Sequence, residues 1–204
     1  MHLHLVTDRG LTLGRSLIDI IRAAAAGGIS AVQLREKDCS TREFVELGNS
    51  VIKELRQLCI PLIINDRVDV ALALGADGVH LGQSDMPYAM ARELLGPQAV
   101  IGLSVETLEQ ARDAEQLDVD YLGLSPVFAT ATKTDLAKPL GLDGISQIRS
   151  ESRHHLVAIG GISHDNAAEV MTAGADGLAV VSAICSAADP QQASQLLLQK
   201  MKGC

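Results

Sequence analysis

The stretch Pro61-Leu62-Ile63-Ile64-Asn65-Asp66-Arg67 joins an unbroken apolar run to three polar residues. An apolar run without polar alternation is typical of a strand that is covered on both faces, as in a parallel sheet. Other short apolar runs occur at residues 3–7, 31–35, 78–81, 100–103, 121–124, 156–160 and 177–181. Amphipathic segments such as residues 17–24 and 44–58 lie between the runs and predict helices.

The alternation gives eight strand–helix units in 204 residues. A doubly wound sheet usually has about five or six strands, so the number of units favours a closed (β/α)8 TIM barrel. The length is near the lower limit for that α/β fold, and we expect a single catalytic barrel domain over residues 1–204. Ser40 and Glu43 predict a capping box at the start of the second helix. Residues 74–79 resemble residues 173–178, which indicates either a duplicated half-barrel or a recurring helix end.

The composition narrows the class of protein further. Apolar residues make up 47% of the chain and aromatic residues 2%, so aliphatic side chains should fill the barrel and the layer beneath its helices. A net charge of -8 argues against a general nucleic-acid binder. No apolar run is long enough for a membrane span, and the first residues lack a signal-peptide pattern, so we expect a cytoplasmic protein. The four cysteines are scattered along the chain without a C-x-x-C pair, so we expect buried, reduced thiols.

Polar side chains gather where the predicted strands end, which is where barrel enzymes build their sites. Asp66 and Asp85 follow neighbouring strands and are candidate ligands for Mg²⁺, although either could instead cap a helix or pair with an arginine. Arg35, Lys37 and Lys133 could surround a pyrophosphate or form salt bridges at the barrel mouth. Asn65 and Ser104 would add neutral hydrogen-bond donors.

A second anion site is indicated after the seventh and eighth strands. Gly160-Gly161 and Val181-Ser182 stand where barrels often bind a phosphate through backbone N–H groups. The loop over residues 129–141 carries several hydroxyl groups and is a candidate lid. His80 is more simply interpreted as a core histidine held by a hydrogen bond. A diphosphate site beside a separate phosphate site suggests group transfer with pyrophosphate as the leaving group.

The ordered set of motifs resembles the thiamine-phosphate synthase family (thiamine-phosphate pyrophosphorylases). The motifs that carry the resemblance are Leu5-Val6-Thr7-Asp8, Gln33-Leu34-Arg35-Glu36-Lys37, Ile64-Asn65-Asp66-Arg67, Gly78-Val79-His80-Leu81-Gly82-Gln83 with Asp85, Gly102-Leu103-Ser104, Thr130-x-Thr132-Lys133, Ile159-Gly160-Gly161-Ile162 and Val181-Ser182-Ala183-Ile184. Most of these motifs are weak singly, but together they span almost the whole chain in family order.

The resemblance implies a transferase that joins 4-amino-5-hydroxymethyl-2-methylpyrimidine diphosphate to 4-methyl-5-(2-phosphoethyl)thiazole, with thiamine phosphate and pyrophosphate as products. It implies a dissociative, Mg²⁺-assisted substitution in which Arg35, Lys37, Lys133 and Ser104 are catalytic. The implied contacts to the pyrimidine diphosphate are Gln33, Leu34, Arg35, Glu36, Lys37, Asn65, Ser104 and Lys133. The implied contacts to the thiazole phosphate are Thr130, Ala131, Thr132, Gly161, Val181 and Ser182. Asp66 and Asp85 would hold Mg²⁺.

Two alternative functions stay open at this point. A thiazole tautomerase relative would share the barrel and the thiazole-phosphate site, and a non-catalytic protein would merely bind thiamine precursors. The intact diphosphate and metal residues favour the synthase over both. The expected partners are phosphorylated small molecules, with no nucleic acid or membrane, and the sequence leaves a homo-oligomer open.

Overall fold

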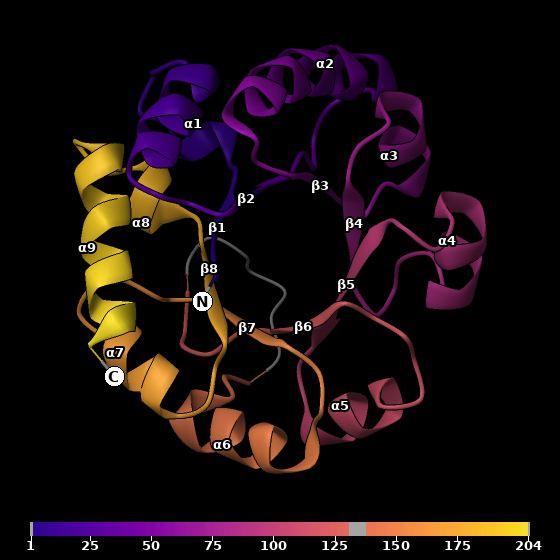
Figure 1. Cartoon of the computed structure of the whole chain (residues 1–204), viewed down its shortest axis with the longest axis vertical. Helices are drawn as coiled ribbons and strands as arrows, with labels where there is room; N and C mark the ends of the chain where they lie inside the picture. Colours follow the sequence, from indigo (N-terminus) through magenta and orange to yellow (C-terminus); the bar gives the residue numbers. More distant parts are fainter. Residues whose placement is uncertain (1, 131–137, 204) are drawn as a thin grey trace.

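Eight parallel strands close into a barrel, in which each strand pairs with the next and β8 pairs with β1 (Figure 1). The computed structural model describes residues 2–130 and 138–203. The strands are β1 (His2–Val6), β2 (Ala31–Leu34), β3 (Leu62–Asn65), β4 (Gly78–Leu81), β5 (Val100–Val105), β6 (Tyr121–Leu124), β7 (Leu156–Ile159) and β8 (Gly177–Val180). Every predicted strand lies within two residues of these bounds, and the predicted (β/α)8 barrel is confirmed.

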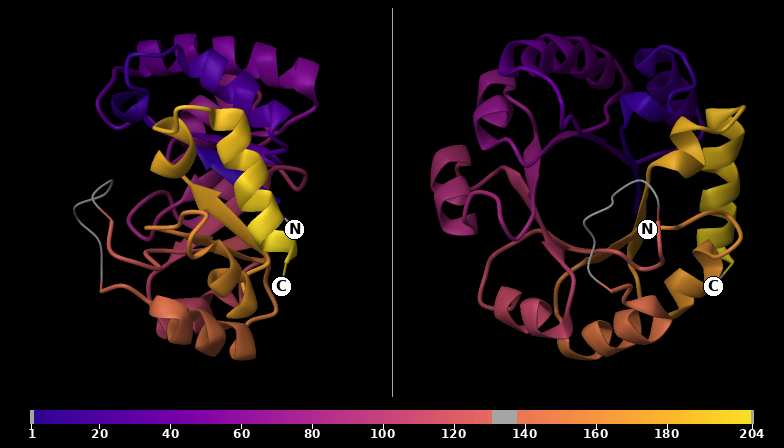
Figure 2. Two further views of the ribbon diagram at one scale, coloured as in Figure 1. Left: turned by 90° about the vertical axis from the view of Figure 1, so that its left-hand side faces the viewer. Right: turned by 180° about the vertical axis from the view of Figure 1, so that it is seen from behind.

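Helices form a ring around the outside of the barrel (Figure 1). Over the described residues they are α1 (Leu17–Ala26), α2 (Thr41–Leu58), α3 (Val68–Leu74), α4 (Tyr88–Leu95), α5 (Leu108–Ala114), α6 (Gly141–Glu151), α7 (Ala167–Thr172), α8 (Ser182–Cys185) and α9 (Pro190–Lys202), with a 3-10 turn η1 (Arg9–Leu11) after β1. The short α8 is an addition to the plain strand–helix alternation. Figure 2 shows both termini at the end of the barrel where the strands begin.

Two separate apolar regions stabilise the barrel. The larger lies between the strands and the helices and includes Phe44, Leu34 and Ile64, each at most 1% exposed. The smaller lies inside the barrel around Val6 and Tyr121. Alternate residues of each strand face inward, and several inward positions hold buried polar side chains: His4, Gln33, Asn65 and His80. The expected aliphatic core is present, but inward-facing polar side chains also stand inside the barrel, where they lead to a cavity.

The predicted capping box at the start of α2 is confirmed. Ser40 Oγ accepts the Glu43 N–H at 3.3 Å, and Glu43 Oε2 accepts the Ser40 N–H at 2.8 Å. This exchange satisfies two N–H groups that the first helical turn leaves without an intrahelical partner.

The cysteines differ from the expectation of buried thiols in one respect. Cys185 is buried and Cys39 is partly buried, but Cys59, which ends α2 with φ at 54°, is exposed. No disulfide joins these three cysteines. Cys204 lies outside the described residues.

An aspartate before each of β4, β6 and β8 holds the beginning of the preceding strand, an arrangement that we call the Asp clasp. Asp77, before β4, accepts the Leu62 N–H at 2.7 Å, and Asp176, before β8, accepts the Leu156 N–H at 2.9 Å. Asp120, before β6, accepts the N–H of residue 101 at 2.8 Å. The likeness of residues 74–79 to 173–178 thus has a structural reason, since both stretches end a helix and then supply a clasp.

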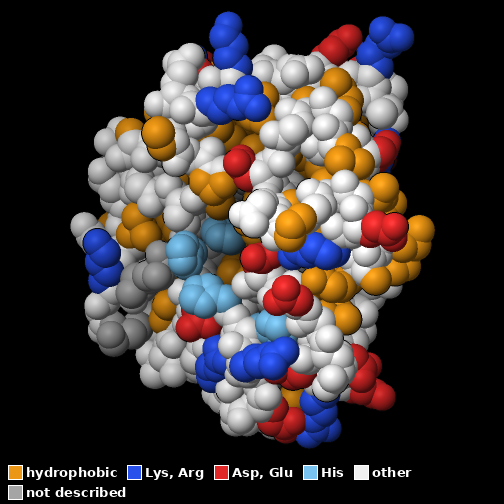
Figure 3. Space-filling view, turned by 45° about the vertical axis from the view of Figure 1, so that its right-hand side comes forward, with side chains coloured by type: hydrophobic (Ala, Val, Ile, Leu, Met, Phe, Trp, Pro, Cys, Tyr) orange, Lys and Arg blue, Asp and Glu red, His pale blue; other side chains and the backbone are white. Residues whose placement is uncertain are grey.

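Histidine side chains gather at the face of the barrel where the strands begin (Figure 3). The ring of His2 lies 6.4 Å from that of His4 and 5.3 Å from that of His155, as measured between centroids. Within the described part of the chain, none of the helices combines the length and apolar character that crossing a bilayer requires.

Candidate active site

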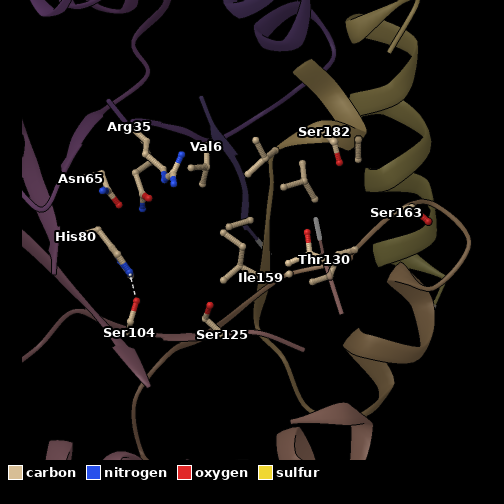
Figure 4. Close-up of a pocket in the computed structure, with 18 of the residues that line it drawn as sticks. Val6, Arg35, Asn65, His80, Ser104, Ser125, Thr130, Ile159, Ser163 and Ser182 are labelled. Carbon is tan, nitrogen blue, oxygen red and sulfur yellow. Dashed lines mark hydrogen bonds between the residues drawn. The ribbon is translucent and has the colours of Figure 1, made fainter. Parts of the chain in front are cut away.

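A cavity of about 370 Å³ opens at the carboxyl ends of the strands. Its polar side chains form two groups with an apolar stretch between them. Figure 4 shows Arg35, Asn65, His80 and Ser104 on one side of the cavity, Ser182 and Ser163 on the other, and Val6 and Ile159 between the two. The cavity therefore presents two polar ends to a ligand.

The first polar end combines cationic and neutral donors. Arg35 follows β2, and its guanidinium lies 3.3 Å from an Asp8 carboxylate oxygen. Asn65 ends β3 with only 8% of its surface exposed, and Gln33 is 6% exposed. Ser104 Oγ lies 2.8 Å from His80 Nε2, while Gln83 Nε2 donates to the Ser104 carbonyl at 2.6 Å.

A lysine and two aspartates adjoin this end. Lys37 Nζ lies 2.5 Å from Asp66 Oδ2. Asp66 adopts a left-handed backbone with φ at 64° directly after β3, and its N–H donates to the carbonyl of His80 on the neighbouring strand. Asp85 accepts the Gly82 N–H at 2.7 Å. Burial raises the pKa of Asp85, and the carboxylate of Asp66 nearby raises this pKa as well. The two predicted metal ligands are therefore brought together, with Lys37 as the counter-ion of one of them.

The pair of carboxylates matches what Mg²⁺ uses in phosphoryl sites, namely one or two carboxylates completed by ligand phosphates and water. Among residues 2–130 and 138–203, no group of three His, Cys, Asp or Glu side chains is arranged to hold a metal. A soft metal with an all-protein ligand set does not suit this donor arrangement, whereas Mg²⁺ does.

The second polar end is built from the segments after β6, β7 and β8. Four of the residues predicted to contact the thiazole phosphate line it: Thr130, Gly161, Val181 and Ser182. Gly161 has φ at 65°, and a Cβ there would lie 2.8 Å from that of Phe128, so only glycine fits the bend. Asn166 Nδ2 donates to the Gly161 carbonyl at 2.9 Å and fixes the loop. Ala131, Thr132 and Lys133, with most of the candidate lid, lie outside the described residues.

Two predicted contact residues do not line the cavity. Leu34 packs in the apolar region beneath the helices and is 0% exposed. Glu36 Oε1 and Oε2 accept the Arg9 Nε–H at 2.9 and 2.8 Å. Successive residues of an extended chain point to opposite sides, so Gln33 and Arg35 face the cavity while Leu34 and Glu36 face away.

Several residues that line the cavity were not predicted to belong to the site. His80 is held by hydrogen bonds, as expected, but it also lines the cavity. Ser125, directly after β6, and Ser163, in the segment between β7 and α7, line it too. A signal for His80 was present, because it is the single polar residue in β4 and has outward-facing apolar neighbours.

Comparison with known proteins gives a consistent result. The family model described as thiamine monophosphate synthase matches residues 3–184. A thiamine-phosphate synthase of Albidiferax ferrireducens is 55% identical, over 98% of this chain and 91% of the relative. A thiamine-phosphate synthase of Syntrophomonas wolfei is 50% identical, over 97% and 94% of the two chains.

A solved structure agrees with these sequence relatives. The thiamine phosphate pyrophosphorylase of Pyrococcus furiosus superposes with a TM-score of 0.89 at 40% identity, and the match covers 99% of this chain and 96% of that one. The family model matches most of the chain, and relatives that are about 50% identical match nearly its full length. The chain belongs to the thiamine monophosphate synthase family.

Proposed function

We propose that this transferase makes thiamine phosphate by joining 4-amino-5-hydroxymethyl-2-methylpyrimidine diphosphate to 4-methyl-5-(2-phosphoethyl)thiazole. The observation that carries the proposal is that one cavity has two polar ends with an apolar stretch between them (Figure 4). Two phosphorylated substrates with flat heteroaromatic rings can lie in it with their rings together and their charged groups apart. The relatives' names support the same activity.

The first polar end takes the diphosphate. Arg35 offers a planar fork of donors and Lys37 a point charge, which suits the oxygens of a diphosphate. Both cations have carboxylate partners, Asp8 and Asp66, which keep them oriented toward this end. Asn65 and Ser104 supply neutral donors beside them. We assign Lys133, which belongs to the same motif set, to this group on the resemblance alone.

Asp66 and Asp85 would hold Mg²⁺, because their adjoining carboxylates suit a cation that also binds diphosphate oxygens. The ion would supply positive charge to the diphosphate. Lys37, which pairs with Asp66, adds a further positive charge at the same end of the cavity.

The second polar end takes the phosphate of the thiazole. The left-handed turn at Gly161 lets the backbone approach a ligand closely. Val181 precedes α8, whose first N–H groups have no partner within the helix, and Ser182 adds a hydroxyl group. Thr130 reaches the same end from the segment after β6.

The reaction is a dissociative substitution. The bond between the pyrimidine methylene carbon and the diphosphate oxygen breaks, and its electron pair leaves with pyrophosphate. The thiazole nitrogen then donates its lone pair to the resulting cation and forms the new carbon–nitrogen bond. This chemistry needs no protein nucleophile, so the residues act by stabilising the leaving group and by aligning the two rings.

The test is formation of thiamine phosphate from the two substrates and Mg²⁺. We expect product with the wild-type chain, a loss of turnover by orders of magnitude in Asp66→Ala and in Lys133→Ala, and unchanged far-ultraviolet circular dichroism in both. Asp69→Ala is the matched control, because Asp69 also pairs with a cation, at 2.5 Å from Arg67, but does not line the cavity. Absence of product from the wild type would overturn the function, and near-normal turnover in Asp66→Ala would overturn the metal assignment.

A further inference from the structure

A column of hydrogen-bonded side chains leads from the cavity down into the barrel. His80 Nε2 lies 2.8 Å from Ser104 Oγ, the contact that is dashed in Figure 4. On the other side of the ring, His80 Nδ1 lies 2.9 Å from the Tyr121 hydroxyl oxygen. Tyr121 also makes a side-chain hydrogen bond with Gln33. Each imidazole nitrogen of His80 therefore has a defined partner, and Tyr121 lies beneath the site without lining it.

The barrel is shaped around this column by two glycines. Gly102 on β5 is the register partner of Tyr121 on β6, and a Cβ at Gly102 would collide with the Tyr121 ring. A Cβ at Gly123 would lie 2.8 Å from His80 Cε1. The rings of His80 and Tyr121 stack with centroids 5.5 Å apart. Glycine in the interior of a strand lowers the stability of that strand and often marks a close approach by another group. Here the two glycines leave the space that the rings of Tyr121 and His80 occupy.

The chemistry of these groups assigns the protons along the column. Burial raises the pKa of Tyr121, and a side-chain hydrogen bond with Gln33 opposes part of that rise, so the tyrosine stays protonated. Its hydroxyl group lies 2.9 Å from His80 Nδ1, and because an imidazole nitrogen is a better hydrogen-bond acceptor than a phenol oxygen, Tyr121 is the donor and Nδ1 the acceptor. His80 then carries its proton on Nε2 and donates to Ser104 Oγ. The proton of Ser104 is left to point into the cavity.

We propose that Tyr121 is a positioning residue for thiamine phosphate formation, because it fixes His80 as the Nε2–H tautomer and so makes Ser104 a hydrogen-bond donor toward the pyrimidine diphosphate. The inference rests on the proposed function for the identity of the ligand. It assigns a role to a side chain that touches neither substrate. Without the Tyr121 hydroxyl group, His80 can adopt either tautomer, and Ser104 can then turn its proton toward the histidine and its lone pair toward the substrate.

The kinetic test is a cycle of Tyr121→Phe and Ser104→Ala. Tyr121→Phe keeps the ring and its stacking, and should lower kcat by about 10- to 100-fold, as loss of an outer hydrogen-bond partner does elsewhere. The KM for the thiazole phosphate should stay within about twofold, because that substrate binds at the other polar end. In the Ser104→Ala background, Tyr121→Phe should have no further effect on kcat. Losses that multiply in the double variant would overturn the proposal.

Tyr88→Phe is the matched control. The Tyr88 hydroxyl group donates to the Asp118 carbonyl at 2.6 Å, and the side chain lies on α4, away from the cavity. Loss of its hydroxyl group removes a comparable hydrogen bond and should leave kcat unchanged.

The tautomer of His80 gives a test that needs neither activity nor a folded variant. The ¹⁵N chemical shifts of the imidazole in the wild-type protein should show Nε2 protonated and Nδ1 unprotonated, and Tyr121→Phe should give a mixture. A wild-type His80 protonated on Nδ1 would overturn the proposal even if Tyr121→Phe did not fold. An inactive wild type with the expected tautomer would instead count against the proposed function alone.

Discussion

Acid should destabilise this barrel through one histidine, His4. The side chain lies inside the barrel with 8% of its surface exposed, and its ring lies edge-on to Tyr121 at 5.6 Å between centroids. Burial, together with smaller contributions from the imidazoles of His2, His80 and His155, lowers the pKa of His4 to about 4.

The sign and size of the effect follow from proton linkage. An unfolded histidine titrates at about 6.5, so the unfolded chain gains a proton between about pH 6.5 and pH 4 that the folded chain does not. The full free energy of unfolding is present above about pH 6.5 and is lost as the pH falls toward 4. For this one group the loss between pH 8 and pH 5 is about 2 kcal/mol, and it approaches about 3 kcal/mol at lower pH.

Urea unfolding followed by circular dichroism at pH 8, 7, 6 and 5 measures this loss. Carboxylates and other histidines also titrate, so the informative quantity is the difference between the wild type and His4→Gln. The variant should lose about 2 kcal/mol less than the wild type over this range. His164→Gln, at a histidine whose side chain is 56% exposed, should follow the wild type. Parallel profiles for the wild type and His4→Gln would refute the reasoning.

Three further predictions concern stability and packing. Ser40→Ala removes the capping box of α2 and should lower the free energy of unfolding by about 1 kcal/mol in urea, whereas an unchanged midpoint would contradict the role of the cap. Phe44→Ala empties the space of a side chain that is 1% exposed and should cost about 3–5 kcal/mol in the same assay; a loss below about 1 kcal/mol would mean that the site collapses freely. Gly102→Ala forces a methyl group against the ring of Tyr121, and should cost about 1–3 kcal/mol by urea unfolding and lower kcat in the product assay; normal kcat would show that the ring can shift.

The strands could be predicted closely because each is a short apolar run bounded by polar residues. In a barrel the outer face is covered by helices and the inner face is filled by side chains, so the run itself marks the strand. Barrel enzymes build their sites at the carboxyl ends of the strands, so the polar residues at those ends were expected to lie together. Several of them, including Arg35 and Ser182, line the cavity.

The direction of individual side chains was harder to predict for the same reason. A wholly apolar strand does not reveal which residues face inward. In β2 the single polar residue, Gln33, marks the inward face and therefore assigns Arg35 to the cavity, but not Leu34 or Glu36. The pairing of Lys37 with Asp66 was also not evident, because Arg35 and Arg67 were equally plausible partners for this aspartate. Such pairings depend on rotamers and distances that residue spacing does not contain.

The Asp clasps have a consequence for how the chain could be divided. They join β3 to β4, β5 to β6 and β7 to β8, and Ser30 before β2 makes a similar link by donating to the Leu3 carbonyl at 3.2 Å. The barrel is thus tied into four blocks of two strands each. A cut between α4 and β5, at residues 96–99, would leave all four links within one fragment or the other. A cut between α3 and β4 would separate Asp77 from the strand it holds, so the first position is the better choice for reassembling an active enzyme from two halves.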